Sequence, residues 1–512
     1  MRFLLLTFLL ILTGCSNDGP KGSGLPADTL VRLTESEARG LDPQMVSDLS
    51  SIRIASDQFE GLTRYMATGQ VEPALAQGWT VSADGLEWTF QLKPDLRFSD
   101  GTPVEAEIFT KALARINDPA TGSPHAALFA IIKTVESPDR RRVIIRLNSP
   151  FPQLPALLAH PAMAALPFHL IGPMGEKWTS MRPLVTSGAY RMTDWKLNQR
   201  MEMEANPHWT GGQPKTPKLI WKSMDNPLSS MRLMLSGGAH ISTAYPANRQ
   251  AWLTKHYSQM VHGSDYLATY YFAFNTRRPP FNNANVRRAL AMATDRRWMT
   301  DKMIAAGNAP AWGLLPPGLS GDTAFRPVWA NWTKERRLAQ ARRLLASAGY
   351  GAANPLRFEI RFNSSPEHRR AAAAMATMWR PLGVEASLLN SEASLHFDSL
   401  KRGDFELARS GWVADLPAPE NFLLVHRSDT GPQNYSGYAS ARFDTALDKA
   451  LAEADPNRRA SKMRAAEEIL IGDMPILPLY FYVSTALVHP KISGWHDNIA
   501  NVHPSYNLAI AK

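Results

Sequence analysis

Cys15 is the only cysteine among the 512 residues, and it ends the run Leu-Thr-Gly-Cys behind a short apolar N-terminus. The apolar stretch, residues 3–12, is too short to cross a hydrocarbon core about 30 Å thick, which takes about 20 helical residues. It has no amphipathic period, so a buried helix with a chance cysteine is the weaker interpretation. The pattern predicts a signal peptide over 1–14, acylation of the Cys15 thiol after cleavage, and a flexible linker over 15–26.

Asp415 is a second residue whose position suggests chemistry, because it directly follows the apolar run 411–414. The residues after it, 416–419, include two prolines, which end a strand at this point. A carboxylate at the end of a buried strand needs a partner. That partner is either a cation brought by a ligand or the backbone amides of a turn that Asp415 caps, and the sequence leaves both open.

Motifs of the common catalytic sites are absent from the sequence. It contains no G-x-S-x-G elbow, H-E-x-x-H helix, G-x-x-x-x-G-K loop or C-x-x-C pair. His160 and His169 share one segment, but the prolines at 161 and 167 favour ordinary surface or core histidines. The sequence therefore predicts no enzyme, no cofactor and no metal site. The 14 tryptophans either fill cores or line a site that holds a ligand without chemistry.

Charge and composition limit the kinds of partner. The formal net charge is +10, and basic residues occur in short pairs such as Arg287-Arg288 and Arg342-Arg343 rather than in one tract. This distribution favours a solvated basic surface and no nucleic-acid partner. A chain of this length with 44% apolar residues can bury two or three cores. With a single cysteine it forms no internal disulfide, so burial must stabilise those cores.

Helical and strand patterns alternate along the chain and predict an α/β protein. Gly349 and Gly472 are placed to end two of the helices. In 98–104, Asp100 and Gly101 predict a turn with a positive φ and a side-chain bond to the backbone. The predicted strands are 86–92, 143–147 and 477–483, and the predicted helices are 286–293, 338–348 and 460–471.

A series of short runs, in order along 28–512, resembles the periplasmic oligopeptide-binding proteins, the family 5 solute-binding components of ABC importers. Any one run is a weak signal, but together, at the spacing of the family, they are a strong one. The runs are LDPQ at 41–44, FEGL at 59–62, PALAQGW at 73–79, DGLEWTFQL at 84–92, FSDGTPV at 98–104, TSGAY at 186–190, YLATYYFAFN at 266–275, PFN at 280–282, VRRALAMATD at 286–295, RSGWVAD at 409–415 and PLYFYV at 478–483.

The resemblance implies a two-lobed periplasmic-binding-protein fold of three α/β domains, with a hinge and a ligand cleft between the lobes. Two chain crossings form the hinge, and a ligand bound between domains I and III is enclosed as the lobes close. The implied bounds are 27–59, 184–265 and 481–512 for a discontinuous domain I, 60–183 for domain II and 266–480 for domain III.

The same resemblance implies where a peptide binds. In this family the aspartate of the RSGWVAD run receives the α-ammonium group of the ligand, and the strand before it pairs with the peptide backbone. Such pairing suits any peptide sequence, because every residue carries the same amide groups. The site residues implied are Asp415 for the ammonium group, Gly411, Trp412 and Val413 in the pairing strand, and Ser47, Asp48 and Leu49 in the facing segment.

Family members neutralise the carboxylate of the peptide with a few basic residues at different depths. Arg409 and His368 stand at two of these positions in this chain. Two others are occupied by Ile304 and Leu400, although the basic residues 401–402 are close by. The resemblance therefore implies a peptide-binding site with fewer counter-charges and a narrower range of peptide lengths than the family pattern provides.

A structural role for Arg409 stays open, because an ion pair with Glu406 or Asp404 would also account for it. For His368, beside two arginines at the start of a predicted helix, a structural role is about equally well supported. Three further positions depart from the family pattern: Ala268 and Val413 replace the cysteines of a frequent disulfide, and Ala393 replaces an aromatic residue.

These observations predict a lipid-anchored periplasmic protein that captures short peptides and delivers them to the permease and ATPase complex of an ABC importer in the inner membrane. A muropeptide, an opine, a metal chelate or a sugar is an alternative ligand for the same role. From other classes, an exported hydrolase and a scaffold without transport stay open. Ser16 resembles residues that direct lipoproteins to the outer membrane, so the sequence leaves the anchoring membrane undecided. We expect a monomer.

The variant Cys15→Ser tests the lipid anchor. Serine offers no thiol for acylation, so we expect an unprocessed or unanchored protein that leaves the membrane fraction. The measurement is fractionation of cells with immunodetection, together with mass spectrometry of the mature N-terminus. Unchanged membrane attachment of the variant would exclude this anchor.

Overall fold

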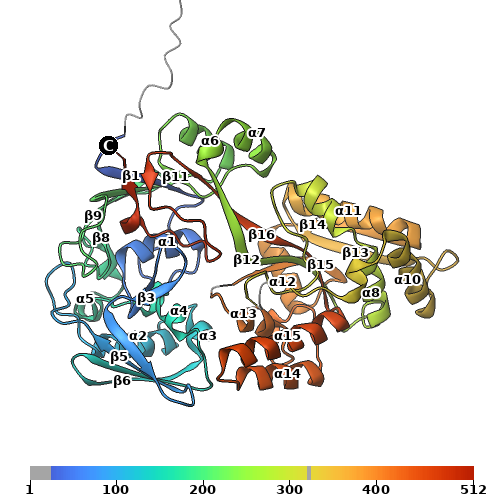
Figure 1. The fold of residues 1–512 in the computed structure, drawn as a ribbon, viewed down its shortest axis with the longest axis horizontal. Coiled ribbons are helices and arrows are strands. Elements are labelled where there is room, and N and C mark those ends of the chain that lie inside the picture. Colours follow the sequence, from blue (N-terminus) through green and yellow to red (C-terminus); the bar gives the residue numbers. More distant parts are fainter. Residues whose placement is uncertain (1–24, 320–323, 415, 512) are drawn as a thin grey trace, which may run out of the picture.

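The structure, a computed structural model, describes residues 25–319, 324–414 and 416–511. The chain forms two α/β lobes that are joined in the middle (Figure 1). Cys15, the predicted signal peptide and Asp415 lie outside the described residues. None of the helices described is long and apolar enough to cross a membrane.

One ten-stranded sheet runs through both lobes. Its two longest strands are antiparallel neighbours at its centre, and their ends contribute to different cores. Tyr480, near the start of one of them, is buried in the second lobe, whereas Val488, at its end, is buried in the first. In spatial order the strands are β14 (Val384–Ser391), β13 (Leu356–Asn363), β15 (Leu407–Val413), β12 (Val261–Phe274), β16 (Ile476–Val488), β11 (Ile241–Ser242), β1 (Thr29–Thr34), β10 (Lys218–Ser223), β9 (Arg200–Ala205) and β8 (Tyr190–Lys196).

The ladder between β12 and β16 connects the lobes, as the long green and red strands of Figure 1 show. The ladder is interrupted between the pairs Asp265–Val483 and Thr269–Phe481. Residues 266–268 of β12 there oppose a single residue of β16. Such a bulge bends a strand and redirects its side chains. The bend lies where the chain passes from one lobe to the other.

The first lobe contains three buried clusters and a separate four-stranded sheet. In that sheet Trp88, Phe90 and Leu92 are buried and alternate with more exposed neighbours, as the sequence pattern predicts. The further elements of this lobe are α1 (Leu49–Gln58), β2 (Thr63–Tyr65), β3 (Val71–Pro73), β4 (Ala76–Val81), β5 (Glu87–Leu92), α2 (Glu107–Asn117), α3 (Ala126–Phe129), β6 (Ile132–Asp139), β7 (Arg142–Leu147), α4 (Leu154–Leu158), α5 (Phe168–Met174), α6 (Pro227–Leu235), α7 (Gln250–His256), β17 (Ile492–Ser493) and β18 (Ala509–Ile510).

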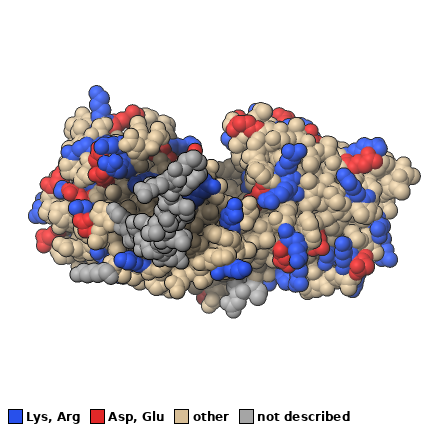
Figure 2. Space-filling view, turned by 90° about the horizontal axis from the view of Figure 1, so that it is seen from above, with Lys and Arg blue, Asp and Glu red and all other residues tan. Residues whose placement is uncertain are grey.

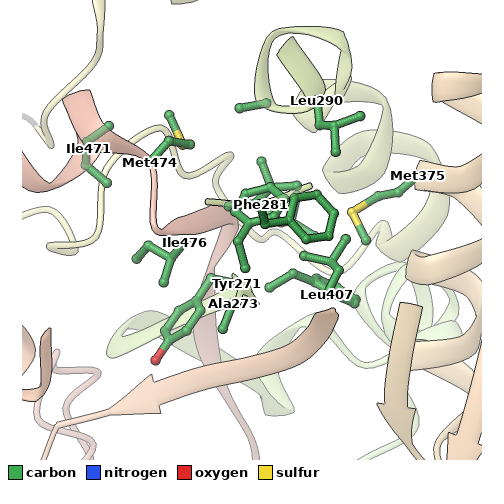
Figure 3. Close-up of a cluster of buried hydrophobic side chains, with 14 of the residues drawn as sticks. Tyr271, Ala273, Phe281, Leu290, Met375, Leu407, Ile471, Met474 and Ile476 are labelled. Atoms are coloured by element: carbon green, nitrogen blue, oxygen red, sulfur yellow. The ribbon is translucent and has the colours of Figure 1, made fainter. Parts of the chain in front are cut away.

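The second lobe is built around one large buried cluster, part of which is drawn in Figure 3. Tyr271 of β12 and Leu407 of β15 cover one side of Phe281, and the helices covering the other side contribute Leu290 and Met375. Burial of this apolar surface stabilises the lobe and fixes β15 in place. The helices of this lobe are α8 (Ala284–Ala293), α9 (Arg296–Trp298), α10 (Lys334–Ser347), α11 (Pro366–Trp379), α12 (Ala393–Arg402), α13 (Pro419–Leu423), α14 (Ala441–Leu451) and α15 (Pro456–Asp473).

The predicted strands and helices are present, but one predicted helix end is wrong. Gly349 follows α10 with a φ of +85°, as expected. Gly472, in contrast, lies inside α15, which ends at Asp473 and is followed by Met474 as its C-cap, with a φ of +51°. Met474 is buried in the cluster of the second lobe. The gain from burying this side chain offsets the strain of its left-handed backbone, so packing rather than the glycine sets the end of the helix.

The turn predicted at Asp100 and Gly101 is confirmed. Gly101 has a φ of +89°, and Oδ1 of Asp100 accepts a hydrogen bond from the backbone N–H of Thr102 at 2.9 Å. The turn lies in the first lobe, away from the junction, so its role is structural.

A short segment after β15 crosses from the second lobe into the first. Leu416 and Ala418 are 3% and 0% exposed, and both belong to the buried cluster formed by residues 62–185 of the first lobe. Two residues further on, Glu420 is again fixed in the second lobe by an ion pair with Arg459 at 2.7 Å. The lobes are therefore held together by apolar contacts of this segment as well as by the β12–β16 ladder.

The variant Leu416→Ala tests this contact between the lobes. A buried Leu→Ala change costs about 2–5 kcal/mol, and here the loss falls on the contact between lobes rather than on either core. We expect a larger radius of gyration in small-angle scattering with unchanged circular dichroism. Leu424→Ala, at an exposed leucine of the same region, is the matched control. A radius of gyration equal to that of the unmodified protein would contradict the assignment.

Candidate ligand-binding site

A cavity of about 540 Å³ lies between the lobes. Seen from above, the surface is indented between the two halves of the molecule (Figure 2). The first lobe contributes Ser47, Leu49 and Arg53, among others, and the second lobe contributes Val413 and the crossing segment 416–417. Enclosure by two lobes that share flexible connections is typical of sites that close around a ligand.

Helix α1 supplies one wall of the cavity. The residues of α1 that line the cavity have the i, i+3, i+4 and i+7 spacing of a single helical face and are Leu49, Ile52, Arg53 and Ser56. Of the predicted facing segment, Ser47 and Leu49 are on this wall, whereas Asp48 is the N-cap of the helix. Its carboxylate accepts a hydrogen bond from the backbone N–H of Ser51 at 2.9 Å, so the side chain has a structural role.

The end of β15 supplies the opposite wall and carries a free edge. β12 pairs with β15 along its whole length, but β13 pairs with it only at Leu407 and Ala408. Among the described strands none continues the ladder on that side from Arg409 to Val413. The Arg409 carbonyl accepts a hydrogen bond from Nε2 of His396 at 2.9 Å. The edge beyond it can pair with an extended chain.

Val413 is 51% exposed and lines the cavity, so the expectation that the run 411–414 forms a buried strand is wrong at this end. The register also places Ala268 directly opposite Val413. These are the two positions at which the family pattern has a disulfide. Their small apolar side chains leave this part of the cavity wall without a covalent crosslink.

Gly411 and Trp412 precede Val413 in β15 and are not among the residues that line the cavity. A Cβ atom at Gly411 would come 3.1 Å from the carbonyl oxygen of Thr269, so glycine lets β12 and β15 approach closely. Trp412 packs against the core of the second lobe, and its Nε1 donates a hydrogen bond to Asn421 at 2.9 Å. Trp412 therefore anchors the strand.

Arg409 is half-buried in a group of aromatic side chains on the same face of the sheet as Gly411 and Val413. Its guanidinium lies over the ring of Tyr270, 4.9 Å from the centroid, and donates a hydrogen bond to the hydroxyl of Tyr482 at 2.9 Å. Its Nε is buried and has no hydrogen-bond partner. A cation–π contact and neutral acceptors stabilise the charge without neutralising it, so the site can still bind an anion.

Arg409 does not form the alternative ion pair with Glu406 or Asp404. Glu406 accepts a hydrogen bond from the backbone N–H of Glu359 instead, and Asp404 pairs with Arg402. Glu367 is the nearby carboxylate, and it accepts a hydrogen bond from Tyr480. In the described part of the chain no carboxylate is within ion-pair distance of Arg409.

His368 is the third residue of α11, and its Nδ1 lies 3.1 Å from the hydroxyl of Tyr270. Burial, reinforced by the positive charge of Arg409, lowers the pKa of His368 to about 3. The imidazole is therefore neutral at neutral pH. His368 and Arg409 both contact Tyr270, and neither is among the residues that line the 540 Å³ cavity; of the two, only Arg409 supplies a positive charge.

The two positions that lack a basic residue are apolar in the structure as well. Leu400 is fully buried, and Ile304 packs against the same cluster. The neighbouring residues Lys401 and Arg402 are exposed and lie near Asp398 and Asp404, respectively. These two cations are therefore held at the surface by acidic neighbours rather than in the site.

Sequence reasoning did not assign several residues of this region to the site. Tyr270 occurs in the YLATYYFAFN run, and Tyr480 and Tyr482 occur in the PLYFYV run. Because one residue separates Tyr480 from Tyr482, the sequence indicated that both lie on the same face of a strand. Arg53 lies on the wall although no motif marks it. Among the described residues there is no group of three side chains suited to a metal ion.

Comparisons with known proteins agree with this architecture. Residues 70–434 match the model of the bacterial extracellular solute-binding proteins, family 5. The periplasmic oligopeptide-binding protein OppA of Escherichia coli is 33% identical, over 97% of this chain and 95% of the relative. The periplasmic murein peptide-binding protein MppA of the same organism is 32% identical, over 94% of this chain and 93% of the relative.

Solved structures of related proteins have the same overall fold. The murein tripeptide-binding protein MppA of Escherichia coli superposes with a TM-score of 0.81 at 32% identity, covering 94% of this chain and 98% of that one. Haemophilus influenzae OppA in complex with the peptide RPPGFSPFR gives 0.80 at 28% identity, covering 95% and 99%. The overall fold is thus shared with these proteins, and the chain is a member of family 5 of the bacterial extracellular solute-binding proteins.

Proposed function

We propose that this protein captures short peptides in the periplasm and delivers them to an ABC importer. The observation that carries the proposal is the free edge of β15, with the cation Arg409 on the same strand and Asp415 two residues after its end in the sequence. A free peptide carries an ammonium group at one end, a carboxylate at the other and a pairing backbone between them. Relatives named as peptide-binding proteins support the same conclusion.

In this proposal Asp415 binds the α-ammonium group and Arg409 binds the terminal carboxylate. The edge at Gly411 and Val413 pairs with the peptide backbone, and Ser47 and Leu49 contact it from the first lobe. His368 completes the carboxylate site as a neutral hydrogen-bonding group. The crowding of tyrosines around Arg409 excludes water, which strengthens the ion pair that a ligand forms there.

We also propose that the lobes move about the β12–β16 ladder. The bounds expected for the third domain, 266 and 480, fall within β12 and β16 next to the bulge. Its irregular pairing supports a hinge there. The remaining expected bounds, 27–59, 60–183, 184–265 and 481–512, belong to the same proposal.

The partners and the location follow from the same role. The relatives are named as periplasmic proteins, and the importer's permease and ATPase complex would receive the closed, loaded form. We propose that Cys15 carries the lipid anchor on a periplasmic membrane face, that the protein works as a monomer, and that it is a binding protein rather than an enzyme.

Peptides of two to six residues, titrated by calorimetry, test the carboxylate site. We expect short peptides to bind best, because Ile304 and Leu400 provide no charge for longer ones. Arg409→Gln removes the counter-charge and should weaken the best peptide by about 10- to 100-fold, the loss of one charge-assisted hydrogen bond of about 1.5–3 kcal/mol. Amidation of the peptide's C-terminus should weaken binding to the unmodified protein and have little further effect in the variant.

Two variants on α11 serve as controls. His368→Gln keeps a neutral hydrogen-bonding group and should change the affinity less than threefold, and Arg370→Gln removes an exposed charge outside the site. A flat affinity profile across peptide lengths, or full affinity in Arg409→Gln, would contradict the assignment. Hydrolysis of a labelled peptide would favour the exported hydrolase, and the absence of any binding would favour the scaffold.

The variant Asp415→Asn tests the ammonium site. It keeps the shape of the side chain and removes one charge, so we expect free peptides to lose about 10- to 100-fold in affinity while thermal unfolding stays unchanged. N-acetylated peptides should bind poorly to the unmodified protein and lose little more in the variant. Equal losses for free and acetylated peptides would show that Asp415 caps a turn instead.

A further inference from the structure

Three arginines of the first lobe line the cavity, and they differ in how their charge is balanced. Arg64 forms ion pairs with Glu60 at 3.0 Å and with Glu72 at 2.8 Å. Its charge is therefore fully matched within the lobe. Arg32 and Arg53 occupy another part of the wall.

Arg32 is 3% exposed and belongs to a buried network. Its Nη1 donates to the carbonyl of His503 at 2.8 Å and to the hydroxyl of Ser505 at 2.6 Å, and its guanidinium lies over Trp221. Ser505 in turn donates to Asp57 at 2.7 Å. Asp57, also on the cavity wall, thus balances the charge of Arg32.

Arg53 has no such balance. Its Nη1 donates to the hydroxyl of Thr243 at 3.0 Å, and in the described part of the chain no carboxylate is within 4 Å of it. Glu35 is the acidic residue that acts on it from a distance, and its side chain is exposed. Burial lowers the pKa of Arg53.

Neighbouring groups add to the positive potential at Arg53. Burial, with a smaller effect from the charge of Arg53, lowers the pKa of Arg32. Burial, together with the charges of Arg32 and Arg53, lowers the pKa of His503 to about 2, so this side chain is neutral at neutral pH. Arg32 and Arg53 carry two positive charges against the single carboxylate of Asp57 on this part of the wall. The described residues that form the opposite wall are Val413, Ala414, Leu416 and Pro417, and none of them is basic.

We propose that Arg53 forms a subsite for a carboxylate on the ligand, so that the protein prefers peptides with an acidic side chain at one of their first two positions. The proposal rests on the peptide-binding function proposed above. The expected position of the acidic side chain in the peptide follows from the residues that share the cavity wall with Arg53. In the sequence Val413, one of them, lies near Asp415, the residue assigned to the amino terminus of the peptide, and four residues from Arg409, which is assigned to its carboxyl terminus. The planar guanidinium fork suits a carboxylate, and a half-buried guanidinium with no carboxylate within 4 Å in the described part of the chain gains most from one.

Pairs of tripeptides that differ only by Glu or Gln at position one, two or three test the proposal. The ratio of dissociation constants within each pair, measured by calorimetry, isolates the charge. The unmodified protein should bind the Glu peptide at least tenfold more tightly at position one or two and show no such preference at position three. In Arg53→Gln the ratio should fall to within about twofold of one.

Two further variants separate a subsite from a structural role. Arg39→Gln removes an exposed arginine near α1 and should keep the tenfold ratio. Arg53→Lys keeps the positive charge and should keep part of the preference even if loss of the Thr243 contact destabilises Arg53→Gln.

Each outcome decides between the two proposals. Equal binding of Glu and Gln peptides by the unmodified protein, or an unchanged ratio in Arg53→Gln, would overturn the subsite and leave peptide capture intact. Failure of every peptide to bind would overturn the proposed function and this inference with it.

Discussion

The hydrogen-bonded ladder between β12 and β16 is the interaction on which the rest of the structure depends. Backbone hydrogen bonds hold the ladder together, and its two ends are buried in different lobes. The same β12 also carries β15, so the strand with the free edge is fixed to the element that joins the lobes. The bulge at 266–268 locates the irregular part of the ladder next to the cavity, where Tyr266 and Leu267 line the wall. A movement of the lobes about this point would directly change the shape of the site.

Charges that lack partners give the site its chemistry. Arg409 lies among tyrosines, and Arg53 lies on a cavity wall, each without a carboxylate at ion-pair distance in the described chain. A partly buried cation without a counter-charge is unfavourable in the protein without ligand, because it loses hydration. An anionic ligand that pairs with it offsets this cost. His368 contributes differently, because burial keeps it neutral and leaves it as a hydrogen-bonding group. In the function proposed above, the two arginines set which ligands the protein binds, while the tyrosines and helix α1 hold them in position.

Contacts across the junction link binding to shape. Leu416 and Ala418 are buried in the first lobe, one and three residues after the position assigned to the ligand's ammonium group and shortly before the second-lobe ion pair of Glu420. A ligand held at the end of β15 would therefore act on a segment that already joins the lobes. Figure 2 shows basic residues on both halves of this face, some of them beside the indentation.

The sequence by itself determined the features that depend on local patterns: the alternation in β5, the Asp100–Gly101 turn, the end of α10 at Gly349 and, through runs of residues in order, the family. Each of these is encoded by residues close in the chain, so no distant contact is needed to recognise it. Tertiary packing decided the rest. It carried α15 past Gly472 because burying Met474 outweighed the strain of its backbone. It turned Trp412 into the second-lobe core and left Val413 exposed. Among the described residues it also left Arg53 without a carboxylate at ion-pair distance and gave it Thr243, 190 positions away, as a hydrogen-bond partner, because only the fold brings such distant residues together.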